Sequence, residues 1–204
     1  MLLYLDGLER SGNVYLSYAL SYSFGVEVVS SKTHMLETLK DYKGSDPFIV
    51  PVRDALDSIS SAKVYRDYVY NNKGVNYVNK ENTEFEVILK RYREYTDYLV
   101  ENPQFFIAPF YAFTEDHNLV VNKIIKFYPN HKHLKNTSVL TKEKIFSNIQ
   151  GIRENAYHPQ LGNLPREDNK EKYQMRSILL EKYNKEIANI QSNIDILYKR
   201  YEAI

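Results

Sequence analysis

The chain has 204 residues, of which 43% are hydrophobic and 26% charged, and its formal net charge is +1. That is enough apolar material for the core of one domain, and the near-neutral charge gives no global attraction for nucleic acid. The absence of cysteine excludes disulfides and thiolate metal sites. The N-terminus becomes acidic too soon for a signal peptide, and no apolar run approaches the roughly 18 residues of a membrane span. We therefore expect a cytoplasmic protein that does not bind a membrane.

Apolar runs and helical patterns alternate along the first two thirds of the chain. Strands are predicted at residues 2–5, 26–29, 48–52 and 105–110, and helices at 11–24, 35–42, 54–70, 84–101 and 116–128. The run at 48–52 is too apolar to alternate, which is typical of a parallel strand covered on both faces. This order predicts an α/β fold with a doubly wound parallel sheet of about four to five strands.

The last part of the chain has a different pattern. Residues 129–165 are irregular, and a long helix is expected from about residue 168 to the C-terminus, so we divide the chain into a domain at 1–165 and a helix at 166–204. An a/d seam with heptad spacing predicts either packing along the same domain or a coiled coil that makes a homo-oligomer. The seam consists of Leu180, Tyr183, Ile187, Ile190, Ile194, Leu197, Tyr201 and Ile204.

The loop after the first strand has the glycine spacing of a phosphate loop. Gly7 and Gly12 stand five residues apart where the strand passes into a helix, so backbone amides can face an anion, and Arg10 adds a cation. Asn13 and Val14 stand where a Walker lysine and hydroxyl residue would hold the γ-phosphate and Mg²⁺. This disfavours a kinase or NTPase. The alternative is a plain strand-to-helix turn with a surface arginine.

Two further segments follow predicted strands at the edge where ligands bind in open α/β sheets. Lys32, Thr33 and His34 follow the second strand, where a histidine can act as a general base and a lysine can stabilise developing charge. The alternative is a solvated loop. Other histidines show no metal-ligand spacing, so no metal site is expected.

The second of these segments begins at the end of the third strand. Arg53 ends that strand and Ser61 lies two helical turns on, so both can face one phosphate, while Asp57 can brace the Arg53 guanidinium. The alternative is an ordinary helix start with Asp54 as N-cap and a surface salt bridge.

Together the three segments resemble the sulfotransferases that use 3′-phosphoadenosine 5′-phosphosulfate, in a short phage- or bacterial-type form. The run from Arg10 to Tyr15 resembles their first motif, residues 32–34 match their K-T-H motif, and Val52 to Ser61 match their V-R-[N/D]-P-x-D-x-x-x-S motif in register. Tyr111 lies near the position of a family tyrosine. The chain departs from the pattern at Arg10, where the family has lysine, and at Ala55, where it has proline.

The resemblance implies a P-loop topology and a nucleotide site. Arg53 and Ser61 would bind the 3′-phosphate, with Arg153 and Arg166 as candidates for completing that site, and Tyr15 would stack on adenine. The residues implied to bind the donor nucleotide are Arg10, Ser11, Gly12, Asn13, Val14, Tyr15, Arg53 and Ser61.

The resemblance also implies the chemistry. His34 would take the proton from a hydroxyl or amine acceptor, Lys32 would stabilise the transferring group, and Arg10 would contact the leaving oxygen. The acceptor would be a small molecule or a glycan, and no metal would take part. Two alternatives stay open: a P-loop nucleotide or nucleoside kinase, and a non-catalytic sulfotransferase-fold binding or assembly module, which the short spacing between the first loop and Lys32 favours.

Overall fold

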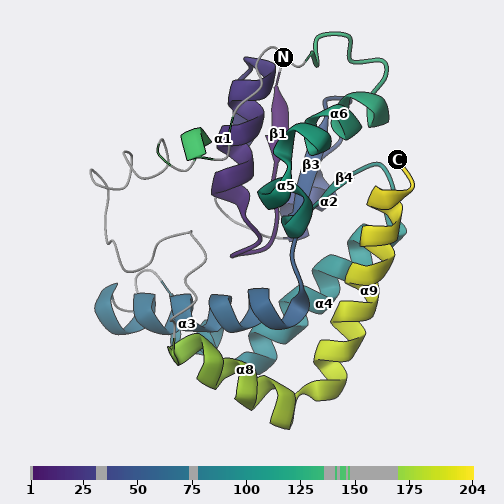
Figure 1. Cartoon of the computed structure of the whole chain (residues 1–204). Coiled ribbons are helices and arrows are strands. Elements are labelled where there is room, and N and C mark those ends of the chain that lie inside the picture. The colour runs from purple at the N-terminus through teal and green to yellow at the C-terminus, as the bar shows by residue number, and fades with distance from the viewer. Residues whose placement is uncertain are drawn as a thin grey trace.

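A four-stranded, all-parallel sheet forms the centre of a mixed α/β fold (Figure 1). The computed structural model describes residues 2–30, 36–73, 78–135, 141, 143–145, 147 and 170–204. The strands run in the order β2-β1-β3-β4, so β1 lies between β2 and β3. Their bounds are β1 Leu3–Leu5, β2 Val28–Ser30, β3 Phe48–Val52 and β4 Phe106–Pro109.

The helices fall on the predicted ranges, with ends shifted by a few residues. Gly25 ends α1 in the left-handed conformation, with φ at 63°, and its amide donates to Ser21, as expected for a glycine at that position. Helix α5 and the short 3₁₀ helix η1 were not predicted. The helices are α1 Asn13–Phe24, α2 Leu36–Asp41, α3 Ala55–Lys73, η1 Lys80–Thr83, α4 Phe85–Glu101, α5 Phe110–Glu115, α6 His117–Phe127, α8 Lys170–Lys182 and α9 Asn184–Glu202.

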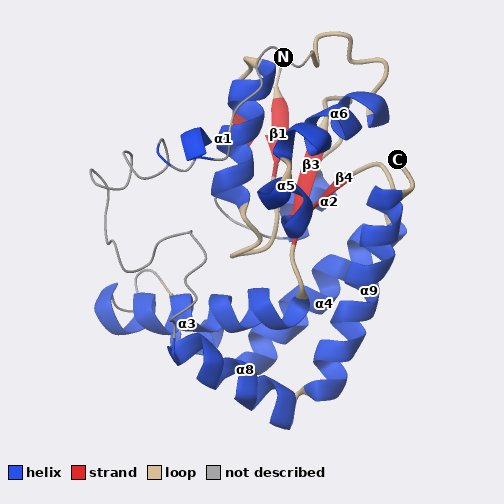
Figure 2. Ribbon diagram, viewed as in Figure 1, coloured by secondary structure: helices blue, strands red, loops and turns tan. Residues whose placement is uncertain are grey.

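Helices cover both faces of the sheet because successive strand side chains point to opposite sides. In β3, Ile49 packs with α1 and α6, whereas Phe48 and Val50 pack with α3, α4 and α9. All five residues of β3 are buried, as the lack of alternation predicted. Figure 2 shows the strands with α1, α5 and α6 around them and the layer of α3, α4, α8 and α9 beyond the sheet.

The C-terminal region forms two helices where one continuous helix was expected. Tyr183 separates α8 from α9 and has a non-helical backbone, with φ at −129° and ψ at 26°. Helix α8 lies along α3 and α9 lies along α4 (Figure 1). The a/d seam therefore splits: Leu180 on α8 is 50% exposed, whereas the α9 members are buried in the core. These buried members are Ile187, Ile190, Ile194, Leu197 and Tyr201.

Candidate functional site

The carboxyl ends of β1 and β3 meet at a topological switch point. From β1 the chain crosses to β2 on one side and then returns to β3 on the other side. In open α/β sheets, ligands bind in the crevice outside the strand ends at such a point. The loop at residues 6–12 leaves β1 here, and Arg53 follows β3 here. The two segments singled out by their sequence therefore lie at the same edge of the sheet.

The two loop glycines are required by close packing. A Cβ on Gly7 would lie 2.6 Å from the carbonyl oxygen of Pro51 in β3, closer than real Cβ contacts come. Gly12 has a φ of 96°, and a Cβ there would lie 2.6 Å from the ring of Phe113. Arg10 also has a positive φ, 67°, which a residue with a side chain rarely adopts. The loop thus has a tightly specified shape.

Contacts with α3 and α4 hold this loop in place. Arg66 is 4% exposed, and its guanidinium donates to both carboxylate oxygens of Glu9 at 2.8 Å. The third nitrogen of Arg66 donates to the Asn82 carbonyl at 2.7 Å. The Tyr92 hydroxyl donates to the Glu9 carbonyl at 2.6 Å. Burial raises the pKa of Tyr92, so this hydroxyl stays a neutral donor. Helices α3 and α4 thus hold the loop through both the side chain and the backbone carbonyl of Glu9.

Several residues assigned to the nucleotide support the loop. The Asn13 side-chain nitrogen donates to the carbonyls of Gly7 at 2.9 Å and Leu8 at 3.1 Å, and the Ser11 hydroxyl donates to Leu8 at 2.6 Å. The Asn13 amide group is thereby turned back onto the loop. Beneath it, a cavity of about 10 Å³, lined in part by Leu8, Ser11 and Arg53, has room for about one water.

Tyr15 lies in the core. Its ring is 6% exposed and stacks on Phe113 with centroids 5.9 Å apart, and burial raises its pKa to about 12. This placement does not agree with the expectation that Tyr15 stacks on adenine, because both its ring and its hydroxyl are enclosed by α1, α5 and their neighbours. Val14, by contrast, is 40% exposed at the start of α1. Gly12 is the N-cap of that helix and offers no side-chain acceptor to its first amides.

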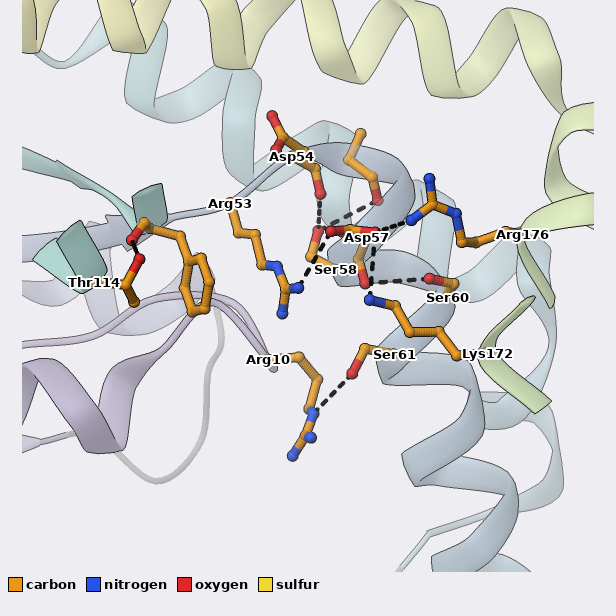
Figure 3. A network of polar contacts seen from close by, with 12 residues as sticks. Arg10, Arg53, Asp54, Asp57, Ser58, Ser60, Ser61, Thr114, Lys172 and Arg176 are labelled. Carbon is orange, nitrogen blue, oxygen red and sulfur yellow. Dashed lines mark hydrogen bonds and ion pairs between the residues drawn. The ribbon is translucent and has the colours of Figure 1, made fainter. Parts of the chain in front are cut away.

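Arg10 and Ser61 contact each other directly. The Arg10 Nε donates to the Ser61 Oγ at 3.0 Å, across 51 residues of sequence, and the guanidinium lies 5.6 Å from the centroid of the Tyr65 ring (Figure 3). The structure therefore brings together two residues that the sequence had placed in two different motifs. Their hydrogen bond joins the first loop to α3.

Arg53 is braced by Asp57, as predicted. Its guanidinium donates to the Asp57 carboxylate at 3.2 Å and lies 4.3 Å from the centroid of the Phe110 ring. The Arg53 side chain is 14% exposed. The aromatic ring and the carboxylate together fix the guanidinium at the carboxyl end of β3; the contact with Asp57 is drawn in Figure 3.

Two cations of α8 complete this group and were missed in the sequence. The Lys172 ammonium lies 3.3 Å from Asp57, and Arg176 donates to the same carboxylate. Their spacing of four residues places them on one face of a helix, and this spacing was the sequence pattern that could have identified them. Burial and the charge of Arg53 lower the pKa of Lys172. Burial raises the pKa of Asp57, but the three cations outweigh it and hold that pKa below its usual value.

Some expected site residues lie outside the described part of the chain. These are Lys32 and His34, assigned to the transfer chemistry, with Thr33 between them, and Arg153 and Arg166. Tyr111 is described: it is 42% exposed, and its hydroxyl donates to Glu202 at 3.4 Å. The structure thus brings Arg10 and Ser61 into contact and leaves Arg53 at the same edge of the sheet, at the end of β3.

Within the described ranges, no helix combines the length and apolar character needed to cross a bilayer, and no three acidic or histidine side chains are grouped to hold a metal ion. Comparison with protein-family models, with curated proteins and with solved structures finds no match to this chain.

Proposed function

We propose that the protein binds a phosphorylated nucleotide at the carboxyl edge of its sheet, with 3′-phosphoadenosine 5′-phosphosulfate as the donor of a metal-independent sulfuryl transfer. The observation that carries the proposal is the contact of Arg10, in the loop after β1, with Ser61 of α3, while Arg53 stands between β3 and α3 at the same switch point. A guanidinium binds phosphate or sulfate oxygens with two parallel hydrogen bonds. The two guanidinium groups of Arg10 and Arg53 therefore suit a ligand with two anionic groups.

Two sets of residues would each bind one anionic group of the nucleotide. Arg10 and the first amides of α1 would face the 5′-phosphosulfate, while Arg53 and Ser61 would face the 3′-phosphate. The hydrogen bond from Arg10 to Ser61, at 3.0 Å, supports a single ligand that reaches both groups. The transfer itself requires mainly positioning and stabilisation of the charge that develops on the leaving oxygen, which Arg10 would supply. His34 would accept the proton of the acceptor hydroxyl or amine.

The placement of Asn13 favours this nucleotide over ATP with Mg²⁺. A kinase of the phosphate-loop class needs a lysine and a hydroxyl at this turn to hold the γ-phosphate and the metal. Here Asn13 stands at the first of these positions, and its side chain is bonded to the loop carbonyls of Gly7 and Leu8.

Nucleotide binding is tested by thermal unfolding with 3′-phosphoadenosine 5′-phosphate, with ATP and Mg²⁺, and with sodium chloride at matched ionic strength. A ligand at 100 times its Kd stabilises by about 2.7 kcal/mol, which corresponds to a rise in Tm of roughly 5–10 °C for a chain of this size. We expect that rise with the first ligand only. A rise with ATP and Mg²⁺ alone would refute the proposal.

A matched pair of variants tests the site. Arg53→Gln removes a charge-assisted interaction, so we expect the Kd for 3′-phosphoadenosine 5′-phosphate to increase roughly 10–100-fold. Arg93→Gln, which removes the same charge from an exposed position on α4, should leave the Kd unchanged. Equal effects of the two substitutions would mean that binding depends on net charge alone.

The transfer step has its own test, the conversion of the sulfated donor to 3′-phosphoadenosine 5′-phosphate in the presence of EDTA. We expect the unchanged protein to carry out this conversion and His34→Ala to lose it.

A further inference from the structure

Three cationic side chains, one from a strand end and two from one helix, share the carboxylate of Asp57. Arg53 comes from the end of β3, whereas Lys172 and Arg176 come from α8, and all three lie within ion-pair distance of the same carboxylate (Figure 3). One carboxylate carries one negative charge against three positive charges. Burial lowers the pKa of Lys172, and the charge of Arg53 lowers it further.

Helix α8 has little apolar attachment to the rest of the protein. Within its 13 residues only Leu179 is fully buried, with Met175 and Ile178 partly buried against the same core. Helix α9 buries five side chains instead. Since apolar burial is the main source of helix docking energy, the ion pairs to Asp57 supply an unusually large share of the attachment of α8 to α3.

We propose that α8 is a strap whose docking on α3 is tightened by an oxyanion, a phosphate or sulfate group, bound between Arg53, Lys172 and Arg176. A doubly charged oxyanion offers acceptors to all three cations and removes their mutual repulsion, so it bridges the end of β3 to α8. This inference rests on the proposed function, because Arg53 belongs to both sites, and it adds that ligand binding fastens α8 to α3. Lys172 and Arg176 are then ligand contacts contributed by the strap.

Hydrogen exchange of the full chain tests the strap, read on peptides that cover residues 170–182. The ligand is inorganic pyrophosphate, compared with sodium chloride at matched ionic strength. We expect amide exchange in α8 to slow at least fivefold with pyrophosphate, while exchange in α6, on the other face of the sheet, stays unchanged. Lys172→Gln should weaken pyrophosphate binding about tenfold, the lower range for a charged hydrogen bond at a partly exposed position. Lys182→Gln, at an exposed position of the same helix, should change it less than twofold.

The outcomes distinguish this inference from the proposed function. The strap proposal is overturned if exchange in α8 is unchanged at saturating pyrophosphate, or if Lys172→Gln binds pyrophosphate as tightly as the unchanged protein. Slower exchange in α8 with pyrophosphate, without any response to 3′-phosphoadenosine 5′-phosphate, would support the strap proposal and overturn the nucleotide proposal. Binding of the nucleotide with no change of exchange in α8 would support the nucleotide proposal and overturn the strap proposal.

Discussion

Removal of the Arg66 guanidinium should release the loop that follows β1. In Arg66→Met, the methionine retains most of the apolar volume, but Glu9 loses both of its 2.8 Å hydrogen bonds and the Asn82 carbonyl loses its donor. Breaking a buried ion pair by removing one partner costs about 3–5 kcal/mol. The Glu9 side chain is 21% exposed and can be partly rehydrated, which lowers the expected loss to about 2–4 kcal/mol.

The assay is urea unfolding followed by circular dichroism, in Arg66→Met, Glu9→Gln and the double variant. The double variant leaves no buried charge unpaired, so it should be more stable than Arg66→Met, and the two effects should not add. Lys63→Met is the control, because the ion pair of Lys63 with Asp67 lies within one helix and should contribute less than 1 kcal/mol. A loss below about 1 kcal/mol in Arg66→Met, or strict additivity, would refute the idea that this pair fastens the loop.

Further substitutions test other parts of the structure, all by the free energy of unfolding. Gly12→Ala should lose about 2–5 kcal/mol, because it combines a left-handed backbone with a clash against Phe113; a neutral effect would contradict the close packing. Tyr128→Phe should lose about 1–3 kcal/mol, because that hydroxyl lies 2.9 Å from the Phe48 carbonyl and accepts from the Phe106 amide at 3.2 Å. Ile194→Ala, 1% exposed, should lose about 2–5 kcal/mol, and a smaller loss would place α9 outside the core.

Acid unfolding should report how much the ionised Asp57 carboxylate contributes to stability. Its folded pKa is lower than the ordinary value of 3.8, so its contribution to stability is fully present above that value and is lost as the pH falls through the folded pKa. Asp57→Asn should therefore show less loss of stability below pH 3.8 than the unchanged protein. Equal acid sensitivity of the two proteins would count against the ion pairs with α8.

Local patterns predicted the elements of the sheet well because each element carries its own signal. The continuous apolar run at β3 and the helix break at Gly25 are properties of a few neighbouring residues. The contact between Arg53 and Asp57 was also predictable, because the two residues stand four apart where the chain enters a helix. Helix α5 was missed because its six residues continue the apolar run of β4 without any polar break.

Long-range contacts set the parts that could not be predicted. Tyr15 has a hydroxyl and an aromatic ring that suit a nucleotide, but it faces Phe113 of α5, an element the sequence did not predict. Lys172 and Arg176 reach Asp57 across more than a hundred residues, and a basic pair on a polar helix gives no indication of its acceptor. The break at Tyr183 likewise depends on where α3 and α4 lie, because the seam itself continues through it.

The burial of α9 has a consequence for synthesis on the ribosome. Its five buried side chains cover one face of the sheet, and the Gln191 side-chain oxygen accepts from the Ala55 amide at the start of α3, 136 residues earlier. Until α9 has left the exit tunnel, the apolar side chains of α4 and β3 that it covers stay open to water. Completion of this core therefore waits for the synthesis of α9, and nascent chains that stop before α9 are candidates for chaperone binding.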